Sequence, residues 1–290
     1  MKFTKTLLAS ALFALSTAGL SPLAMADSAP NKLNQALKAY ENQDYAAAFN
    51  LFKPFAEQGV ASVQLILGLM YDNGRGVKQD YHQAVKWYEK AAEQGVKEAQ
   101  FNLGNAYFKG EGVKQDYHQA FKWYEKAAEQ GDSNAQFNLG GMYGKGRGVK
   151  QDYHQAVKWY EKAAGQGKAE AQFNLGNMYY KGQGVKQDYH QAFKWYEKAA
   201  EQGDSKAQFN VGLMYDKGQG VKQDYHQAFK WFEKTAEQGE AAAQSKLGLM
   251  YALGHGVRQD EQQAKYWVGK ACDNGDQNGC DLYRIFNKGE

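Results

Sequence analysis

The strongest constraint on the fold is a period of 36 residues that runs through most of the chain. The segment GVKQDYHQA occurs five times at this spacing, and a degraded copy, GVRQDEQQA, starts at Gly256. A fixed period of this length is typical of stacked helical repeats, in which each unit buries its apolar face against its neighbours. All the tryptophans and a set of glycines follow the period: Trp87, Trp123, Trp159, Trp195, Trp231 and Trp267, and Gly68, Gly104, Gly140, Gly176, Gly212 and Gly248.

Each unit contains the pattern of a first helix, for example residues 99–108. Ala99, Leu103 and Tyr107 recur at spacings of four, which places them on one apolar stripe of a helix. Gly104 borders that stripe. Because glycine within a helix costs about 1 kcal/mol relative to alanine, its recurrence predicts that a neighbouring helix packs closely there.

A second helix is predicted to follow Asp116 and to end at Gly131. The Asp116 carboxylate can cap the free amides of the first turn, and Gln119 stands three residues later, as in a capping box. We expect the tryptophans to form much of the core between stacked units. The apolar face of this helix would consist of Tyr117, Ala120, Trp123, Tyr124 and Ala127.

The turn between the two helices contains a GxGV segment, which is Gly110–Val113 in the second repeat. Two glycines permit positive φ angles and hence a tight reversal. The segment lacks the third glycine of a dinucleotide fingerprint and the lysine-serine pair of a phosphate loop, and it follows a helix. We therefore interpret it as a structural turn.

The pattern AQxxLGxMYxxGxGVxxDxxxAxxWxxKAAxxG resembles the Sel-1-like repeat, a relative of the tetratricopeptide repeat with a longer turn. The residues that carry the resemblance are 100–107 and 116–131 and their equivalents, over about residues 60–275. The resemblance implies an all-α, right-handed α-solenoid of stacked antiparallel helix pairs whose first helices line a concave groove. It also implies a scaffold for protein complexes, and bacterial members are often exported.

Four segments are expected along the chain. Residues 1–26 read as a cleaved signal peptide, because Lys2 and Lys5 precede an apolar run that ends before Ala24-Met25-Ala26. Cleavage near Ala26 would give a periplasmic or secreted protein without a membrane span, since the apolar run is too short for a permanent one. The rest divides into an irregular N-terminal capping hairpin at 27–59, six repeats at 60–275 and a C-terminal capping helix at 276–290.

The charge pattern argues against nucleic acid as a partner. The chain has 35 Lys and Arg against 32 Asp and Glu, and removal of the leader lowers the basic count to 33. Lysines alternate with acidic residues in every repeat, whereas nucleic-acid binders usually carry a clustered basic face. We expect a monomer that binds a protein or peptide.

The two cysteines, Cys272 and Cys280, are interpreted first as a disulfide, because an exported chain meets an oxidising compartment. Their CDNGDQNGC segment also resembles cysteine pairs in disulfide-bonded members of the family. Closing this loop should stabilise the C-terminal helix by roughly 2–3 kcal/mol.

No catalytic, cofactor or metal site is predicted. The repeated histidines, such as His118, give no converging ligand set and are expected on the solvated face of the second helix. No serine lies in a GxSxG or SxxK motif. Glu125 and Glu129 lie one helical turn apart, but lysine neighbours and an exposed position give no evident reason for a raised pKa.

The positions that vary between copies gather on the first helix, opposite its apolar stripe. Asparagines in a row can hydrogen-bond a peptide backbone, and flanking aromatics can anchor it. We expect acids at Asn138 and Asn174 together to abolish partner capture without lowering the melting temperature. The candidate partner-binding residues are Asn102, Asn105, Phe108, Lys109, Asn138, Lys145, Asn174, Asn177, Tyr180, Lys181, Asn210 and Lys217.

Three functions remain open from the sequence. The leading hypothesis is an exported protein-interaction scaffold without enzymatic activity or cofactor. One alternative, implied by some exported cysteine-rich relatives, is binding or hydrolysis of peptidoglycan fragments or β-lactams. The other is a repeat-expanded surface antigen.

Overall fold

A computed structural model describes residues 28–287 of the chain. These residues form α-helices and turns and contain no strand. They divide into two compact units, the first of which ends at Gln151 and the second of which begins at Asp152. The predicted signal peptide lies outside the described residues.

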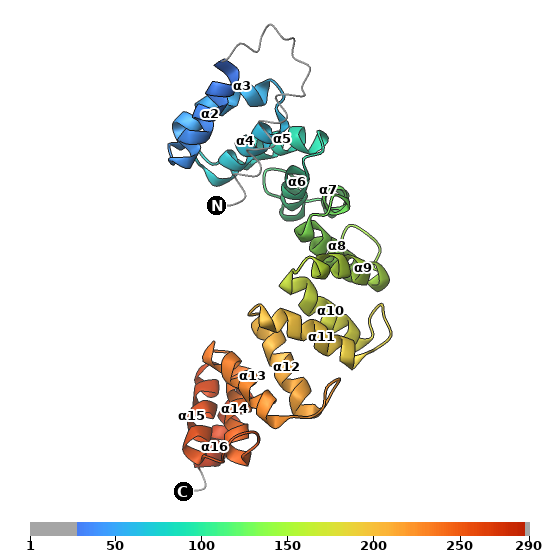
Figure 1. Ribbon diagram of the computed structural model, residues 1–290, viewed down its shortest axis with the longest axis vertical. Helices are drawn as coiled ribbons and strands as arrows, with labels where there is room; N and C mark the ends of the chain where they lie inside the picture. Colours follow the sequence, from blue (N-terminus) through green and yellow to red (C-terminus); the bar gives the residue numbers. More distant parts are fainter. Residues whose placement is uncertain (1–27, 288–290) are drawn as a thin grey trace. The chain divides into compact units, whose positions relative to one another are not determined.

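The described residues form seven helices in the first unit and eight in the second (Figure 1). Those of the first are α2 (Ser28–Glu41), α3 (Tyr45–Glu57), α4 (Ala61–Asn73), α5 (Tyr81–Glu93), α6 (Lys97–Lys109), α7 (Tyr117–Glu129) and α8 (Ser133–Lys145). Those of the second are α9 (Tyr153–Gly165), α10 (Ala169–Lys181), α11 (Tyr189–Glu201), α12 (Ser205–Lys217), α13 (Tyr225–Glu237), α14 (Ala241–Leu253), α15 (Glu261–Asp273) and α16 (Gln277–Asn287).

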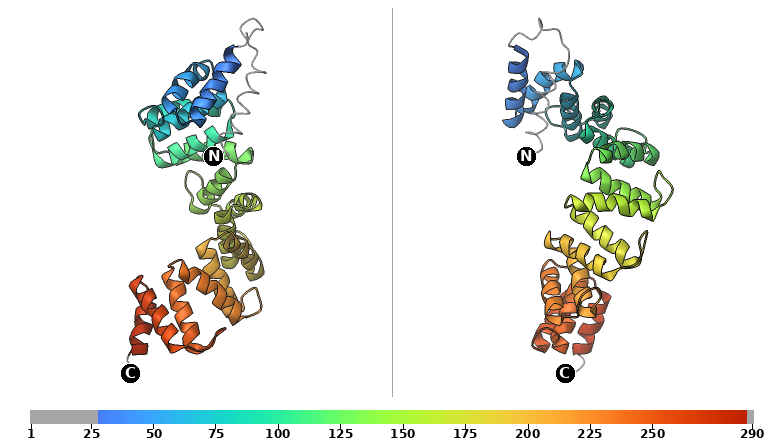
Figure 2. Two further views of the ribbon diagram at one scale, coloured as in Figure 1. Left: turned by 60° about the vertical axis from the view of Figure 1, so that its left-hand side comes forward. Right: turned by 45° about the vertical axis from the view of Figure 1, so that its right-hand side comes forward.

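Neighbouring helices pair along the chain, as α6 does with α7 in the first unit and α14 with α15 in the second. The views of Figure 2 show the same pairs side by side. The predicted all-α fold of 36-residue helix pairs is confirmed. Within the described residues, none of the helices combines the length and apolar character needed to cross a membrane.

The second helices begin at the predicted cap. Asp116 adopts an extended conformation, and its carboxylate accepts hydrogen bonds from the amides of His118 and Gln119 at 2.9 and 3.0 Å. The first helices end at the first turn glycine: Gly110 has φ +77° and its amide donates to the Ala106 carbonyl. The second turn glycine, Gly112, also has positive φ, and a Cβ there would overlap the Tyr81 carbonyl of the preceding repeat. Both predicted glycine roles are thus confirmed.

Gly104 explains the close packing of the two helices within a repeat. A Cβ added at Gly104 would lie 2.6 Å from Cδ1 of Tyr124, a side chain that is 1% exposed. The helix therefore accepts a residue of poor propensity because only a glycine leaves room for the ring.

Stacking between repeats uses buried glutamines as well as apolar side chains. The Gln100 amide donates to the Ala92 carbonyl at 3.1 Å, and its carbonyl accepts from Gln130 at 2.8 Å. Because the Gln100 side chain is buried, these bonds satisfy groups that would otherwise destabilise the core.

The expectation that the tryptophans fill the core is wrong for most of them. Trp123 is half-buried, and the Lys126 ammonium lies 4.1 Å from its ring centroid, a cation-π contact. The adjacent Phe121 is buried instead, with its ring 5.3 Å from that of Tyr143 in the next repeat. A helix between two neighbours needs two apolar stripes, and the tryptophan lies at the border of both. Among the six, Trp87 belongs to a buried cluster.

Candidate functional site

The candidate residues occupy the first helices of both units. We call the two groups the first-helix face of the first unit and that of the second unit. In the first unit α6 carries Asn102, Asn105, Phe108 and Lys109, and α8 carries Asn138 and Lys145. In the second unit α10 carries Asn174, Asn177, Tyr180 and Lys181, and α12 carries Asn210 and Lys217.

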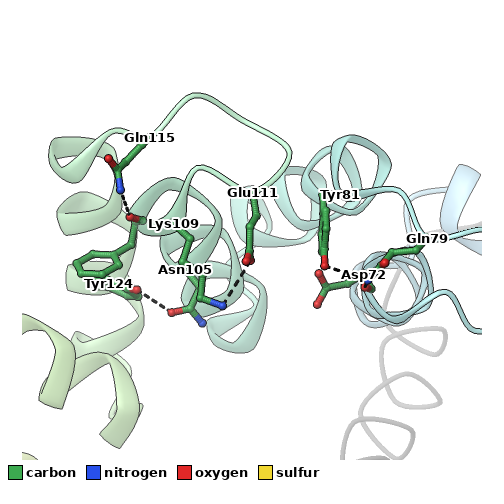
Figure 3. A network of polar contacts seen from close by, with 9 residues as sticks. Asp72, Gln79, Tyr81, Asn105, Lys109, Glu111, Gln115 and Tyr124 are labelled. Atoms are coloured by element: carbon green, nitrogen blue, oxygen red, sulfur yellow. Dashed lines mark hydrogen bonds and ion pairs between the residues drawn. The ribbon is translucent and has the colours of Figure 1, made fainter.

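The asparagines of the first unit have partners within the protein. The Tyr124 hydroxyl donates to Oδ1 of Asn105 at 2.7 Å (Figure 3). Burial raises the pKa of Tyr124, and a hydrogen bond from Asn138 of the next repeat opposes that shift. One buried hydroxyl therefore links two repeats.

The second unit repeats this arrangement. The Tyr196 hydroxyl donates to Asn177 at 2.8 Å. Burial also raises the pKa of Tyr196, which Asn210 opposes by hydrogen bonding, and Asn174 acts in the same way on Tyr160. Asn138 and Asn174 thus contact buried hydroxyls, so the expectation that acids there leave the melting temperature unchanged needs correction.

The aromatic candidates pack against the second helix of their own repeat. The Phe108 ring lies 5.2 Å from that of Tyr117, and the Tyr180 ring lies 5.1 Å from that of Tyr189, both edge to face. The Tyr180 hydroxyl also donates to Gln219 at 3.2 Å. Both rings are half-buried, so each keeps an accessible edge.

The lysine candidates are exposed at the carboxyl ends of their helices. Lys109 pairs with Glu111 at 3.4 Å between Nζ and Oε2. A cation in the last turn is favoured by the helix dipole, so these lysines also have a structural role. The other three are Lys145, Lys181 and Lys217.

A polar pocket lies on the first-helix face of the first unit, and sequence reasoning missed Asp72 and Tyr88 among the residues that line it. Asp72 of α4 and Tyr88 of α5 line it together with Asn102, Asn105 and Lys109 of α6. Figure 3 shows Asp72 beside Tyr81, and Asn105 and Lys109 on the neighbouring helix. The signal was the variation between copies: Asp72 stands where the next repeat has Phe108.

Two other expectations concern titratable groups on the second helices. The His118 ring is exposed, but its Nδ1 lies 3.3 Å from the Gly148 carbonyl of the next turn. Burial, and then the like charge of Glu129, raise the pKa of Glu125, which corrects the expectation that it has no cause to shift. Within residues 28–287, no three His, Cys, Asp or Glu side chains are grouped to hold a metal ion.

The predicted disulfide is present in the second unit. It joins Cys272, in the last turn of α15, to Cys280 in α16, with 4.4 Å between the Cα atoms. Next to it, the Asp276 carboxylate accepts hydrogen bonds from the Ser245 hydroxyl and from the Gly279 amide. The closing helix is thus held covalently and by a buried polar contact.

Comparison with known proteins identifies the repeat. The Sel1 repeat profile matches residues 39–60, 61–96, 97–132, 133–168, 169–204, 205–240 and 241–276. The first of these segments is shorter than the others and lies in the hairpin formed by α2 and α3. No curated protein matches the sequence.

Several solved structures resemble the chain, and two of them share more than 30% of its residues. One is a protective antigen of uropathogenic Escherichia coli with the same repeat fold, which is 38% identical over 94% of this chain with a TM-score of 0.84. This alignment covers 57% of the length of that antigen. The other is a Sel1 repeat protein from Oxalobacter formigenes, 34% identical, with a TM-score of 0.70, covering 85% of this chain and 97% of that one. The chain belongs to the Sel1 repeat family, whose members are typically scaffolds for protein interactions.

Proposed function

We propose that the protein is an exported interaction scaffold whose first-helix faces bind a protein or peptide partner. The observation that carries the proposal is the distribution of variable residues. The second helices have nearly the same sequence in every repeat, whereas the first helices differ at the surface positions that flank their buried stripe. Selected differences at such positions are expected where a partner is recognised.

The chemistry of these faces supports peptide recognition. Half-buried Phe108 and Tyr180 offer aromatic edges, which often dominate binding energy. Exposed lysines such as Lys145 and Lys217 lie on the first helices of the following repeats and would favour acidic segments of a partner.

The test compares charge reversals on the two faces of the helix pairs. Lys145→Glu with Lys217→Glu alters each first-helix face, and Lys122→Glu with Lys194→Glu makes the same charge change on exposed positions of the second helices. Proteins of the source organism retained by the immobilised chain should be lost with the first pair and kept with the second. Equal retention by both variants would contradict binding at these faces.

Export is the second part of the proposal. The leader pattern at residues 1–26 and the disulfide between Cys272 and Cys280 both support it. The mature protein isolated from the source organism should begin near Asp27 in intact-mass analysis, and a chain that retains Met1 would contradict cleavage.

A surface-antigen role is a second candidate, and the likeness to the Escherichia coli protective antigen favours it. Antibodies raised against residues 27–290 should then label intact cells. Labelling confined to permeabilised cells would contradict this candidate.

A further inference from the structure

The polar pocket of the first unit is small and bounded by three helices. Its cavity volume is about 90 Å³, and its walls come from α4, α5, α6 and the turn after α6. Since a water molecule needs roughly 10–15 Å³ of such space, the pocket has room for the end of one long side chain.

The pocket contains a buried hydroxyl that makes no hydrogen bond of normal geometry. The Tyr88 side chain is 3% exposed, and within residues 28–287 its hydroxyl makes no hydrogen bond of normal geometry, although it interacts with the neighbouring Asp72 carboxylate. In the next repeat the equivalent Tyr124 donates to Asn105, but Leu69 holds the position of Asn105 in the repeat of Tyr88. Tyr196 keeps this pairing with Asn177, and Phe232 has no hydroxyl in the repeat of Leu213. Tyr160, whose repeat has Gly141 at that position, is hydrogen-bonded by Asn174 of the next repeat. A buried hydroxyl without a well-formed hydrogen bond is costly, so the Tyr88 hydroxyl beside the Asp72 carboxylate favours a ligand that can donate to both groups.

Asp72 is the second unusual residue. Two of its equivalents, Phe108 and Tyr180, pack edge to face on the tyrosines that correspond to Tyr81. A carboxylate in their place opens the pocket beside Tyr81. It also lies in the last turn of α4, where the helix dipole disfavours a negative charge.

The charges that face the pocket leave Asp72 uncompensated. Lys109 is paired with Glu111 at 3.4 Å, so their charges largely cancel. The remaining charge in the lining belongs to Asp72, whose pKa is raised first by burial and then, against the opposing Tyr88 hydroxyl, by Glu111. The site therefore favours a positively charged group that can donate hydrogen bonds.

We propose that this pocket binds the positively charged group of a basic side chain presented by a partner, either the ammonium group of lysine or the guanidinium group of arginine. The cation would lie against the Asp72 carboxylate and donate a hydrogen bond to the Tyr88 hydroxyl oxygen. Asn102 and Asn105 would line its entry. That a protein presents this side chain rests on the proposed scaffold function, whereas the cation site itself does not.

The test uses small probes and the full chain. The probes are acetylated and amidated tripeptides Ala-X-Ala, with X as lysine, arginine or uncharged norleucine, titrated into ¹⁵N-labelled protein. The side-chain amide signals of Asn102 and Asn105 should shift and saturate at millimolar lysine or arginine peptide, and the stronger of the two identifies the preferred cation. Shifts of equal size with norleucine, or none that saturate, would overturn the proposal.

Variants separate this site from other surfaces. Asp72→Asn should weaken binding roughly tenfold, the effect of losing one charged hydrogen bond, and Tyr88→Phe should weaken it less. Asp216→Asn is the matched control, because Asp216 has the register of Asp72 but the next helices there carry Phe232 and Lys246 in place of Tyr88 and Asn102. Unchanged binding by Asp72→Asn, or an equal loss with Asp216→Asn, would refute the assignment. Probe binding without capture of any protein would contradict the scaffold function and leave the cation site standing.

Discussion

Asp72 combines a half-buried carboxylate with the carboxyl end of a helix, and both features oppose its ionisation. Because burial raises its pKa in the folded chain, the ionised form costs folding stability. The cost is absent below the unfolded pKa of about 3.9 and grows as the pH rises through the folded value. We expect Asp72→Asn to raise the melting temperature at neutral pH and to lose this advantage near pH 3. A constant difference across the range would contradict the linkage, with Asp216→Asn as the baseline.

The two tyrosines of the first unit should respond differently to loss of the hydroxyl. Tyr124→Phe removes a bond to Asn105 and leaves the amide of Asn138 without its partner, so the free energy of unfolding should fall by about 1–2 kcal/mol. Tyr88→Phe removes a hydroxyl that makes no hydrogen bond of normal geometry and interacts only with the Asp72 carboxylate, so it should cost less than Tyr124→Phe. Urea unfolding of the two variants makes the comparison, and a larger loss for Tyr88→Phe would contradict the contrast.

At the scale of the helix, the contact between Gly104 and the Tyr124 ring sets how closely the two helices of a repeat approach each other. Gly104→Ala gains helix propensity of about 1 kcal/mol, but its Cβ would force the buried Tyr124 ring to move. Such overpacking typically costs 1–3 kcal/mol, so we expect a net loss of about 1 kcal/mol in thermal or urea unfolding. Gly165, in α9, has nothing within 4 Å of an added Cβ. Gly165→Ala should therefore be neutral or stabilising, and equal losses at both glycines would rule out the packing explanation.

The helices, their caps and the glycine turns could be predicted from the sequence because each depends on local chemistry. Asp116 as a cap and Gly110 at positive φ need no knowledge of distant residues. The burial of Phe121 in place of Trp123 could not be predicted, because a helix with two neighbours has two apolar stripes and the period does not rank them. The placement of the candidate residues on the first helices could also be predicted, because they recur at the repeat period. The hydrogen bond from Tyr124 to Asn105, and the lack of a well-formed bond at the Tyr88 hydroxyl, could not be predicted, because both depend on where side chains lie.

At the scale of the whole molecule, the helices within each of the two units pack mainly on those next to them in the chain. Such contacts make stability local, so a change at one end should not spread along the repeats. Helix α16 departs from this succession, because it contacts α14 as well as α15, and it carries one cysteine of the disulfide. The C-terminal end is therefore closed by three helices, not by a pair.

This arrangement predicts where loss of the disulfide is felt. Replacing Cys272 and Cys280 by serine should lower the free energy of the closing segment by about 2–3 kcal/mol, since the unfolded segment gains chain entropy. Amide hydrogen exchange should accelerate in α15 and α16, which the disulfide joins, and remain unchanged in α4 through α8 of the first unit. Reduction of the wild-type chain should reproduce this pattern. If stability is local, the effect stays in the helices next to the missing bond. Faster exchange throughout the first unit would show instead that the repeats unfold as one cooperative body.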